Sequence, residues 1–160
     1  MKKSSTVFLR VVIVLLGIGM FALMLWEPHL EGRNAHANLF EIYFNDPFLA
    51  YAYTASIAFF VALYQGFTLL GYVAENKIFS SASVKALRTI KYCAMALVAF
   101  ILGAEAYIVL TQSGKDDIAG GVMMGLFLMF ISVVIATVAG VFEQLLQRAV
   151  VIKSENDLTV

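Results

Sequence analysis

The chain has 160 residues, a length that suits one domain, and 61% of these residues are hydrophobic while only 14% are charged. This is more apolar surface than a water-soluble fold of the same size can bury, so the composition excludes an ordinary soluble protein. Eleven basic and eleven acidic residues leave no net charge, so we do not expect direct nucleic-acid binding. We expect a single membrane domain over residues 1–160.

Four segments are apolar enough to cross a bilayer, which takes a helix of about 20 residues. They cover approximately residues 7–26, 48–73, 90–112 and 118–142. Lipid offers the backbone no hydrogen-bond partners, and these segments do not alternate apolar with polar residues as the strands of a barrel do. The sequence therefore predicts an all-α integral membrane protein, a bundle of four transmembrane helices followed by a tail at residues 143–160.

The basic residues fall mainly on one side of the expected membrane. Only Arg33 and Lys115 lie in the first and third connections. The others lie near the N-terminus, in the middle connection and in the tail: Lys2, Lys3, Arg10, Lys77, Lys85, Arg88, Lys91, Arg148 and Lys153. Cytoplasmic connections carry an excess of lysine and arginine. We therefore expect both termini and the middle connection to face the cytoplasm, with Arg10 reaching back to lipid phosphates.

Small residues recur at helical spacing in three of the four segments and would let neighbouring helices approach closely. The second segment has Ala58, Ala62 and Gly66, the third has Ala96, Ala99, Gly103 and Ala106, and the fourth has Gly121, Gly125, Ser132, Ala136 and Gly140. Such patterns are common in membrane helices. We expect packing within one chain, with a homo-oligomer as the alternative.

Glu105 is an acid inside the third segment, where an unpaired charge is costly. It follows Gly103 by two residues, about 200° around the helix, so we expect it off the closest-packed face. The hydroxyls of Tyr53, Thr54 and Ser56 in the second segment lie at a similar depth and can donate to a carboxylate. Three interpretations follow: a structural hydrogen-bonded acid, a proton- or cation-binding site facing water, or a contact with another chain.

The middle connection, residues 75–92, is expected to form a turn and then a helix whose first turn is capped by Ser80, Ser81 or Ser83. Four basic residues belong to it: Lys77, Lys85, Arg88 and Lys91. They are expected to bind anionic headgroups of the lipid bilayer, or alternatively to form a docking surface for a cytosolic protein.

The tail predicts an amphipathic continuation of the fourth helix. Its end, with Leu158 and Val160 before a free carboxylate, has the apolar-x-apolar pattern that can add a strand to a partner's sheet. We therefore count both residues among the candidates for partner binding.

Recognisable catalytic chemistry is missing from the sequence. His29, Glu31, His36 and Glu41 carry metal-binding atoms, but their spacing matches no strong metal pattern. There is no glycine-rich phosphate loop, no H-E-x-x-H and no G-x-S-x-G motif. We expect neither an enzyme nor a bound metal or other cofactor.

Three stretches resemble the bacterial membrane proteins grouped as domain of unknown function 2975: "NKIFSSASVKALRTIKYCA", "GKDDIAGGVMMG" and "LLQRAVVIKSENDLTV". The resemblance covers nearly the whole chain and implies a four-span protein of the bacterial cytoplasmic (inner) membrane. It also implies a small helix-turn-helix regulator as a partner, because such a regulator is often encoded beside these proteins. It supplies no catalytic residues.

The sequence therefore favours a noncatalytic interaction or regulatory protein. We expect it to present its basic connection and tail to a cytoplasmic partner such as a DNA-binding regulator. The alternative is a small transporter or channel subunit that uses Glu105 as a proton- or cation-linked site.

Overall fold

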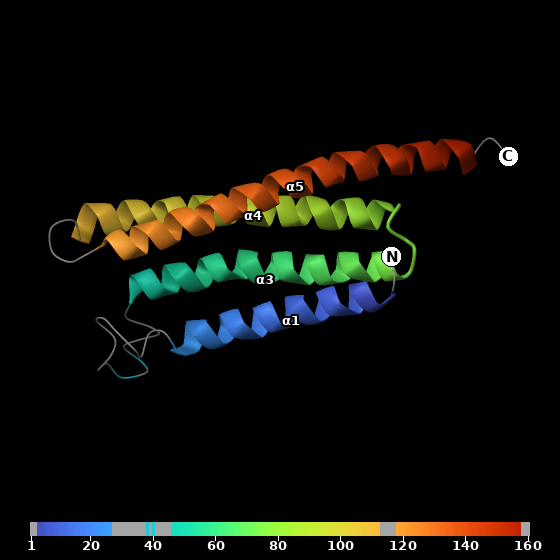
Figure 1. Ribbon diagram of the computed structural model, residues 1–160. Coiled ribbons are helices and arrows are strands. Elements are labelled where there is room, and N and C mark those ends of the chain that lie inside the picture. Colours follow the sequence, from blue (N-terminus) through green and yellow to red (C-terminus); the bar gives the residue numbers. More distant parts are fainter. Residues whose placement is uncertain (1–2, 27–37, 39, 41–45, 113–117, 158–160) are drawn as a thin grey trace.

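Four long helices make up most of the computed structural model, which describes residues 3–26, 38, 40, 46–112 and 118–157 (Figure 1). They are α1 (Lys3–Trp26), α3 (Pro47–Ala74), α4 (Ser81–Gln112) and α5 (Ala119–Asp157). Each is long and apolar enough to cross a membrane. The prediction of an all-α membrane protein with four spanning helices is confirmed.

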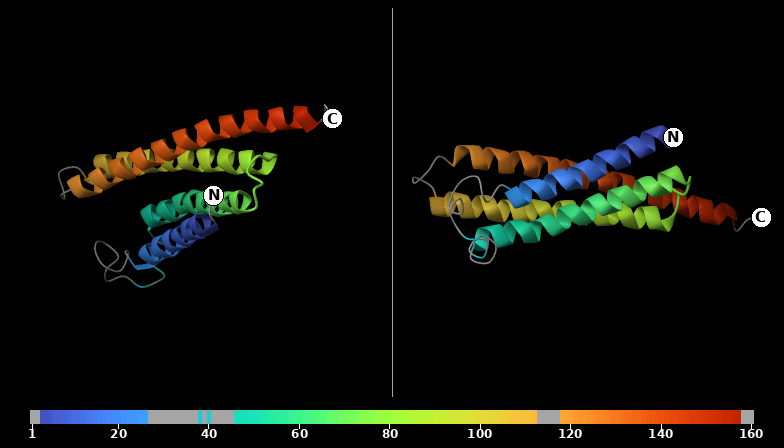
Figure 2. Two further views of the ribbon diagram at one scale, coloured as in Figure 1. Left: turned by 45° about the vertical axis from the view of Figure 1, so that its right-hand side comes forward. Right: turned by 90° about the horizontal axis from the view of Figure 1, so that it is seen from below.

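The helices pack against one another in chain order. The main contacts join α1 to α3, α3 to α4, and α4 to α5, and the last pair shares the most extensive contact. Both chain termini lie at the same end of the molecule as the connection between α3 and α4 (Figures 1 and 2). We call this the terminal end, and the opposite end the loop end.

Capping residues define where two of the helices begin. Oδ1 of Asp46 accepts hydrogen bonds from the backbone nitrogens of Phe48 at 3.0 Å and Leu49 at 3.2 Å, and Pro47 begins α3. A proline fits there because the first turn needs no intrahelical N–H donor. At the start of α4, Oγ of Ser80 accepts a hydrogen bond from the backbone nitrogen of Ser83 at 3.3 Å, which confirms the predicted serine cap.

The face of α5 that packs on α4 follows a seven-residue repeat. One row of buried and half-buried positions recurs alternately four and three residues apart, with Gly140 and Ala149 beside it: Val122, Gly125, Met129, Ser132, Ala136, Ala139, Glu143, Leu146 and Val150. This spacing is typical of two helices that pack along their whole length. We call the contact between α4 and α5 the seam.

A hydrophobic core lies at the terminal end of the seam, where Val84, Leu87 and Leu146 are buried and Leu69, Ile78 and Val150 pack around them. Elsewhere large apolar side chains point outward, as on α1 and α5, where Phe8 and Phe130 are 66% and 67% exposed. Exposed apolar surface on this scale is expected where the surrounding solvent is lipid, because apolar helices need not bury their side chains from hydrocarbon.

The expected small-residue contacts form at some positions only. A Cβ atom at Gly66 would lie 3.5 Å from Cδ1 of Ile13 on α1, and one at Gly140 would lie 3.3 Å from Cδ of Lys91 on α4. Gly121 has no such neighbour within 4 Å, and Ala99 and Ala106 are exposed. The stripe of α5 is thus packed into the seam except at Gly121, whereas much of the stripe expected on α4 is exposed.

Gly17 and Gly19 offer a matched test of the α1–α3 contact. A Cβ atom at Gly17 would lie 3.6 Å from Cδ1 of Leu63, whereas one at Gly19 would meet nothing within 4 Å. We expect Gly17→Leu to lower the free energy of unfolding by about 1 to 3 kcal/mol through overpacking. Gly19→Leu should be much closer to neutral. Thermal unfolding of both variants in detergent measures the difference, and equal losses would contradict the contact.

Candidate functional site

Glu143 of α5 lies between two basic residues of α4. Nε of Arg88 donates to Oε1 of Glu143 at 2.6 Å, and Nζ of Lys91 donates to Oε2 at 2.7 Å. Glu143 is 7% exposed, whereas the side chains of Arg88 and Lys91 are 52% and 26% exposed. We call these three residues the Glu143 clasp. It carries one net positive charge and ties α4 to α5 near the terminal end.

The helical repeat explains why these three side chains meet. Arg88 and Lys91 are three residues apart and therefore share a face of α4. Glu143 occupies a seam position between Ala139 and Leu146. Glycine at position 140 leaves room for the Lys91 stem against α5. The sequence analysis placed position 143 only at the start of the tail and did not single out Glu143, although its place in the seven-residue repeat was the available signal.

The remaining basic residues of the middle connection are placed differently. Lys77 forms an exposed ion pair with Glu75 at 2.9 Å, and this hydrogen bond and the opposite charge lower the pKa of Glu75 and raise that of Lys77. Lys85 is exposed, and its side chain forms no hydrogen bond or ion pair with the residues that the structure describes. Of the four predicted binding residues, Lys85 is thus the one with its charge uncompensated.

The C-terminal part of α5 continues past the connection between α3 and α4 (Figure 1). Leu146 is buried in the terminal core, but Leu145 and Ile152 are 54% and 59% exposed. This segment is helical, as the sequence predicted. Leu158 and Val160, the residues proposed for strand addition, lie outside the described residues.

Glu105 of α4 lies directly against Gly125 of α5, where a Cβ atom would collide with the carboxylate. Its Oε2 atom is buried and has no hydrogen-bond partner among the described residues. The prediction that Glu105 lies off the closest-packed face is wrong. The Gly103 side of α4 faces α3, where Tyr51 approaches it, while Glu105 faces the larger contact with α5.

The hydroxyls expected to bind Glu105 donate elsewhere. Tyr53 donates to the carbonyl oxygen of Met24 on α1 at 2.8 Å. Thr54 donates to Ala50 at 2.9 Å and Ser56 to Tyr53 at 2.7 Å, both within α3. A hydroxyl has one proton to donate, so the predicted bonds to Glu105 are not formed. The prediction placed these residues beside Glu105, but the α3 residues next to this part of α4 are Phe48, which stacks on Tyr107, and Tyr51, which approaches Gly103.

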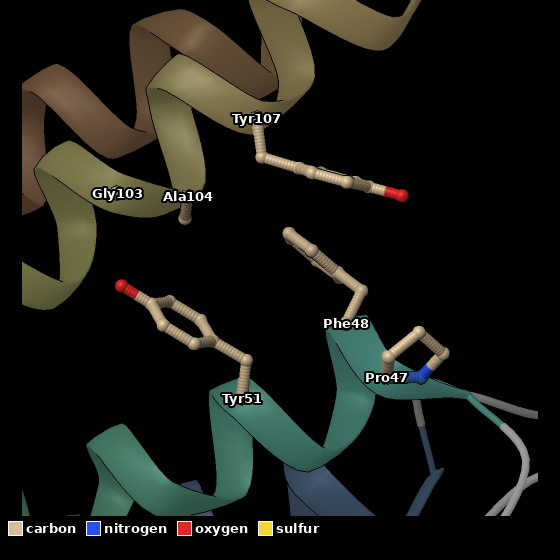
Figure 3. A pocket seen from close by; sticks show the side chains of 6 residues that line it. All are labelled: Pro47, Phe48, Tyr51, Gly103, Ala104 and Tyr107. Atoms are coloured by element: carbon tan, nitrogen blue, oxygen red, sulfur yellow. The ribbon is translucent and has the colours of Figure 1, made fainter.

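A pocket of about 320 Å³ lies between α3 and α4 near the loop end. Its walls are Pro47, Phe48, Tyr51, Gly103, Ala104 and Tyr107 (Figure 3). The Phe48 and Tyr107 rings stack with centroids 5.7 Å apart, and the Tyr51 hydroxyl donates to the carbonyl oxygen of Phe100 at 2.9 Å. These walls carry no charged side chain, so they suit an apolar group and supply no acid, base or nucleophile at neutral pH.

No group of three or more metal-binding side chains occurs within the part of the chain that the structure describes. His29, Glu31, His36 and Glu41 lie outside that part.

Comparison with known proteins matches residues 4–160 to the family described as "Protein of unknown function (DUF2975)". The chain is 41% identical to "Uncharacterized membrane protein YoaS" of Bacillus subtilis (strain 168) over 162 residues, which covers 100% of both chains. No solved structure shows a significant match. The resemblance drawn from the sequence is confirmed, and neither name assigns an activity.

Replacing Glu143 tests the clasp against an exposed ion pair. We expect Glu143→Gln to lower the thermal unfolding midpoint by several degrees, because the neutral amide cannot accept two charge-assisted hydrogen bonds. The matched control is Glu75→Gln, whose ion pair with Lys77 is 61% to 69% exposed and should contribute little. High salt should leave most of the Glu143→Gln effect in place, because partly buried pairs are screened weakly. Equal effects of the two substitutions would contradict a structural role for the clasp.

Proposed function

This chain belongs to the DUF2975 family of unknown function, and we propose that it is a noncatalytic membrane protein whose terminal end docks a soluble partner. We further propose that the terminal end faces the cytoplasm. The excess of lysine and arginine at the N-terminus, in the middle connection and in the tail supports this orientation.

The length of α5 is the observation that carries the proposal. A helix of 39 residues is about 58 Å long, whereas the hydrocarbon core of a bilayer is about 30 Å thick. At a typical tilt of about 20° the crossing takes about 32 Å, so nearly half of α5 lies outside the hydrocarbon. A spanning anchor alone does not require this extension.

We call the part of α5 that projects past the terminal core the extension. Its exposed side chains favour docking of a partner over contact with water alone. Val151 and Ile152 are 45% and 59% exposed on the part of α5 that projects past the terminal core. Apolar side chains on an otherwise polar helix are the usual anchors when a helix binds in a partner's groove. Lys85 and Lys153 add exposed positive charge at the same end, which favours a partner with an acidic surface.

A small helix-turn-helix regulator is the partner class that we propose, because the family resemblance implies it and docking would hold such a regulator at the membrane. Binding would occur through its protein surface and not through its DNA. The rigid seam beneath the extension supports this role, since the Glu143 clasp and the terminal core fix the direction in which α5 leaves the membrane.

The docking proposal predicts that partner capture depends on residues 151–160. This deletion spares Glu143, Leu146 and Val150, so the seam is retained. We expect a tagged protein lacking these residues to lose its cytoplasmic partner in a crosslinked pull-down from its own host. Val151→Gln with Ile152→Gln should weaken capture similarly, while Gln144→Ala is the matched control. A partner list unchanged by both the deletion and the double variant would refute docking through the extension.

A second candidate function is a small transporter or channel subunit that uses Glu105. The buried and unpartnered Oε2 atom supports it, since an acid inside a membrane commonly serves a proton or cation. Helices that pack in chain order do not surround a central pore, so this function would require several copies of the chain. The docking proposal needs no such assembly, and we favour it for that reason.

Glu105→Gln separates the two candidates, because it keeps the size of the side chain and removes its charge. If Glu105 carries a transported proton or cation, pH-dependent flux into liposomes should fall at least tenfold in this variant. Partner capture should be unchanged. Flux that survives the substitution would remove the transporter candidate, and absence of flux in the wild-type protein would do the same.

A further inference from the structure

Arg10 is a cation in the contact between α1 and α3 that no described side chain neutralises. Its Nε atom is buried and has no hydrogen-bond partner, and its guanidinium lies over the Phe67 ring at 4.9 Å from the centroid. The pKa of Glu75 is lowered mainly by Lys77 and least by Arg10, and the Glu75 carboxylate is paired with Lys77 at 2.9 Å. The guanidinium therefore has N–H donors available to bind an anion.

A groove of about 310 Å³ opens beside this guanidinium. Apart from Arg10, its walls are apolar: Val7, Val11, Val14 and Leu15 of α1 and Phe67 of α3. Val11 and Val14 are 51% and 46% exposed, so the groove is open along the side of α1. The groove therefore combines one cation, Arg10, with an apolar surface that follows the axis of α1.

The position of Arg10 places this combination at the edge of the hydrocarbon. Arg10 lies seven residues after Lys3, or about 10 Å along α1 from the terminal end. The helix beyond it contains no further charge until its end at Trp26. A glycerophospholipid has the matching layout, with a phosphate at the polar boundary and acyl chains that continue into the hydrocarbon.

Gly71 permits this placement of the guanidinium. A Cβ atom at position 71 would lie 2.5 Å from an Nη atom of Arg10, so any larger residue would push the side chain away from α3. The glycine and the Phe67 ring hold the guanidinium at the mouth of the groove, where it cannot swing freely into water.

We propose that this groove binds one anionic phospholipid from the leaflet at the terminal end. The lipid phosphate accepts hydrogen bonds from Arg10, and one acyl chain lies against Val11, Val14 and Phe67. An anionic lipid is preferred over a zwitterionic one because it brings no ammonium group to a region already rich in lysine and arginine. The bound lipid supplies the anion that the chain itself lacks.

Native mass spectrometry of the purified protein tests this site, with phosphatidylglycerol or phosphatidylcholine added at equal concentrations. We expect one phosphatidylglycerol to remain bound to the wild type, with at least fivefold lower occupancy in Arg10→Met. Val14→Trp should cause a similar loss by filling the groove while the charge stays, which keeps the test informative if Arg10→Met fails to fold. Arg148→Gln also removes one positive charge, from α5, and should bind lipid like the wild type.

Retention of phosphatidylglycerol by Arg10→Met or Val14→Trp at the wild-type level would overturn the site. Equal occupancy by phosphatidylcholine would overturn the preference for an anionic lipid, and loss in Arg148→Gln would show that only the total charge matters. The measurement needs no soluble partner, so its outcome is independent of the docking proposal.

Discussion

The antiparallel packing of α4 on α5 is the contact on which the other features depend. A seven-residue repeat on α5 brings Glu143 to Arg88 and Lys91 at one end of the seam and Gly125 to Glu105 nearer the other. The same register buries Leu146 beside Val84 and Leu87. Because α5 is longer than α4, this register also makes the C-terminal part of α5 project beyond the bundle.

The spanning segments and the terminal end lie in different environments, and their side chains are arranged differently. Within the spanning segments, single glycines allow close contacts while large apolar side chains point outward, as expected in lipid. At the terminal end, Val84, Leu87 and Leu146 form a core like that of a soluble protein. Four of the basic side chains at this boundary have a described partner: Arg88 and Lys91 bind Glu143, Lys77 binds Glu75, and Arg10 lies over Phe67.

Features that depend on local sequence pattern could be predicted from the sequence. Contacts that depend on which helix faces meet could not. The four spans, the serine cap before α4 and the helical tail follow from hydropathy and capping residues, and all are confirmed. Glu105 was assigned to the wrong face because depth along the membrane does not reveal rotation or neighbours. Tyr53, Thr54 and Ser56 were expected to donate to Glu105, yet each hydroxyl donates to a backbone carbonyl. Glu143 could have been found only by extending the seam repeat beyond the apolar segment.

Docking of a cytoplasmic partner on the projecting part of α5 requires the terminal end to face the cytoplasm. Cysteine labelling tests this orientation directly. In a Cys93→Ser background, a membrane-impermeant maleimide would be applied to intact cells or spheroplasts carrying Asn38→Cys or Ser81→Cys. These positions are exposed at the loop end and the terminal end. The account predicts that Asn38→Cys is labelled from outside and Ser81→Cys only after the membrane is opened. Labelling of Ser81→Cys in intact cells would contradict it.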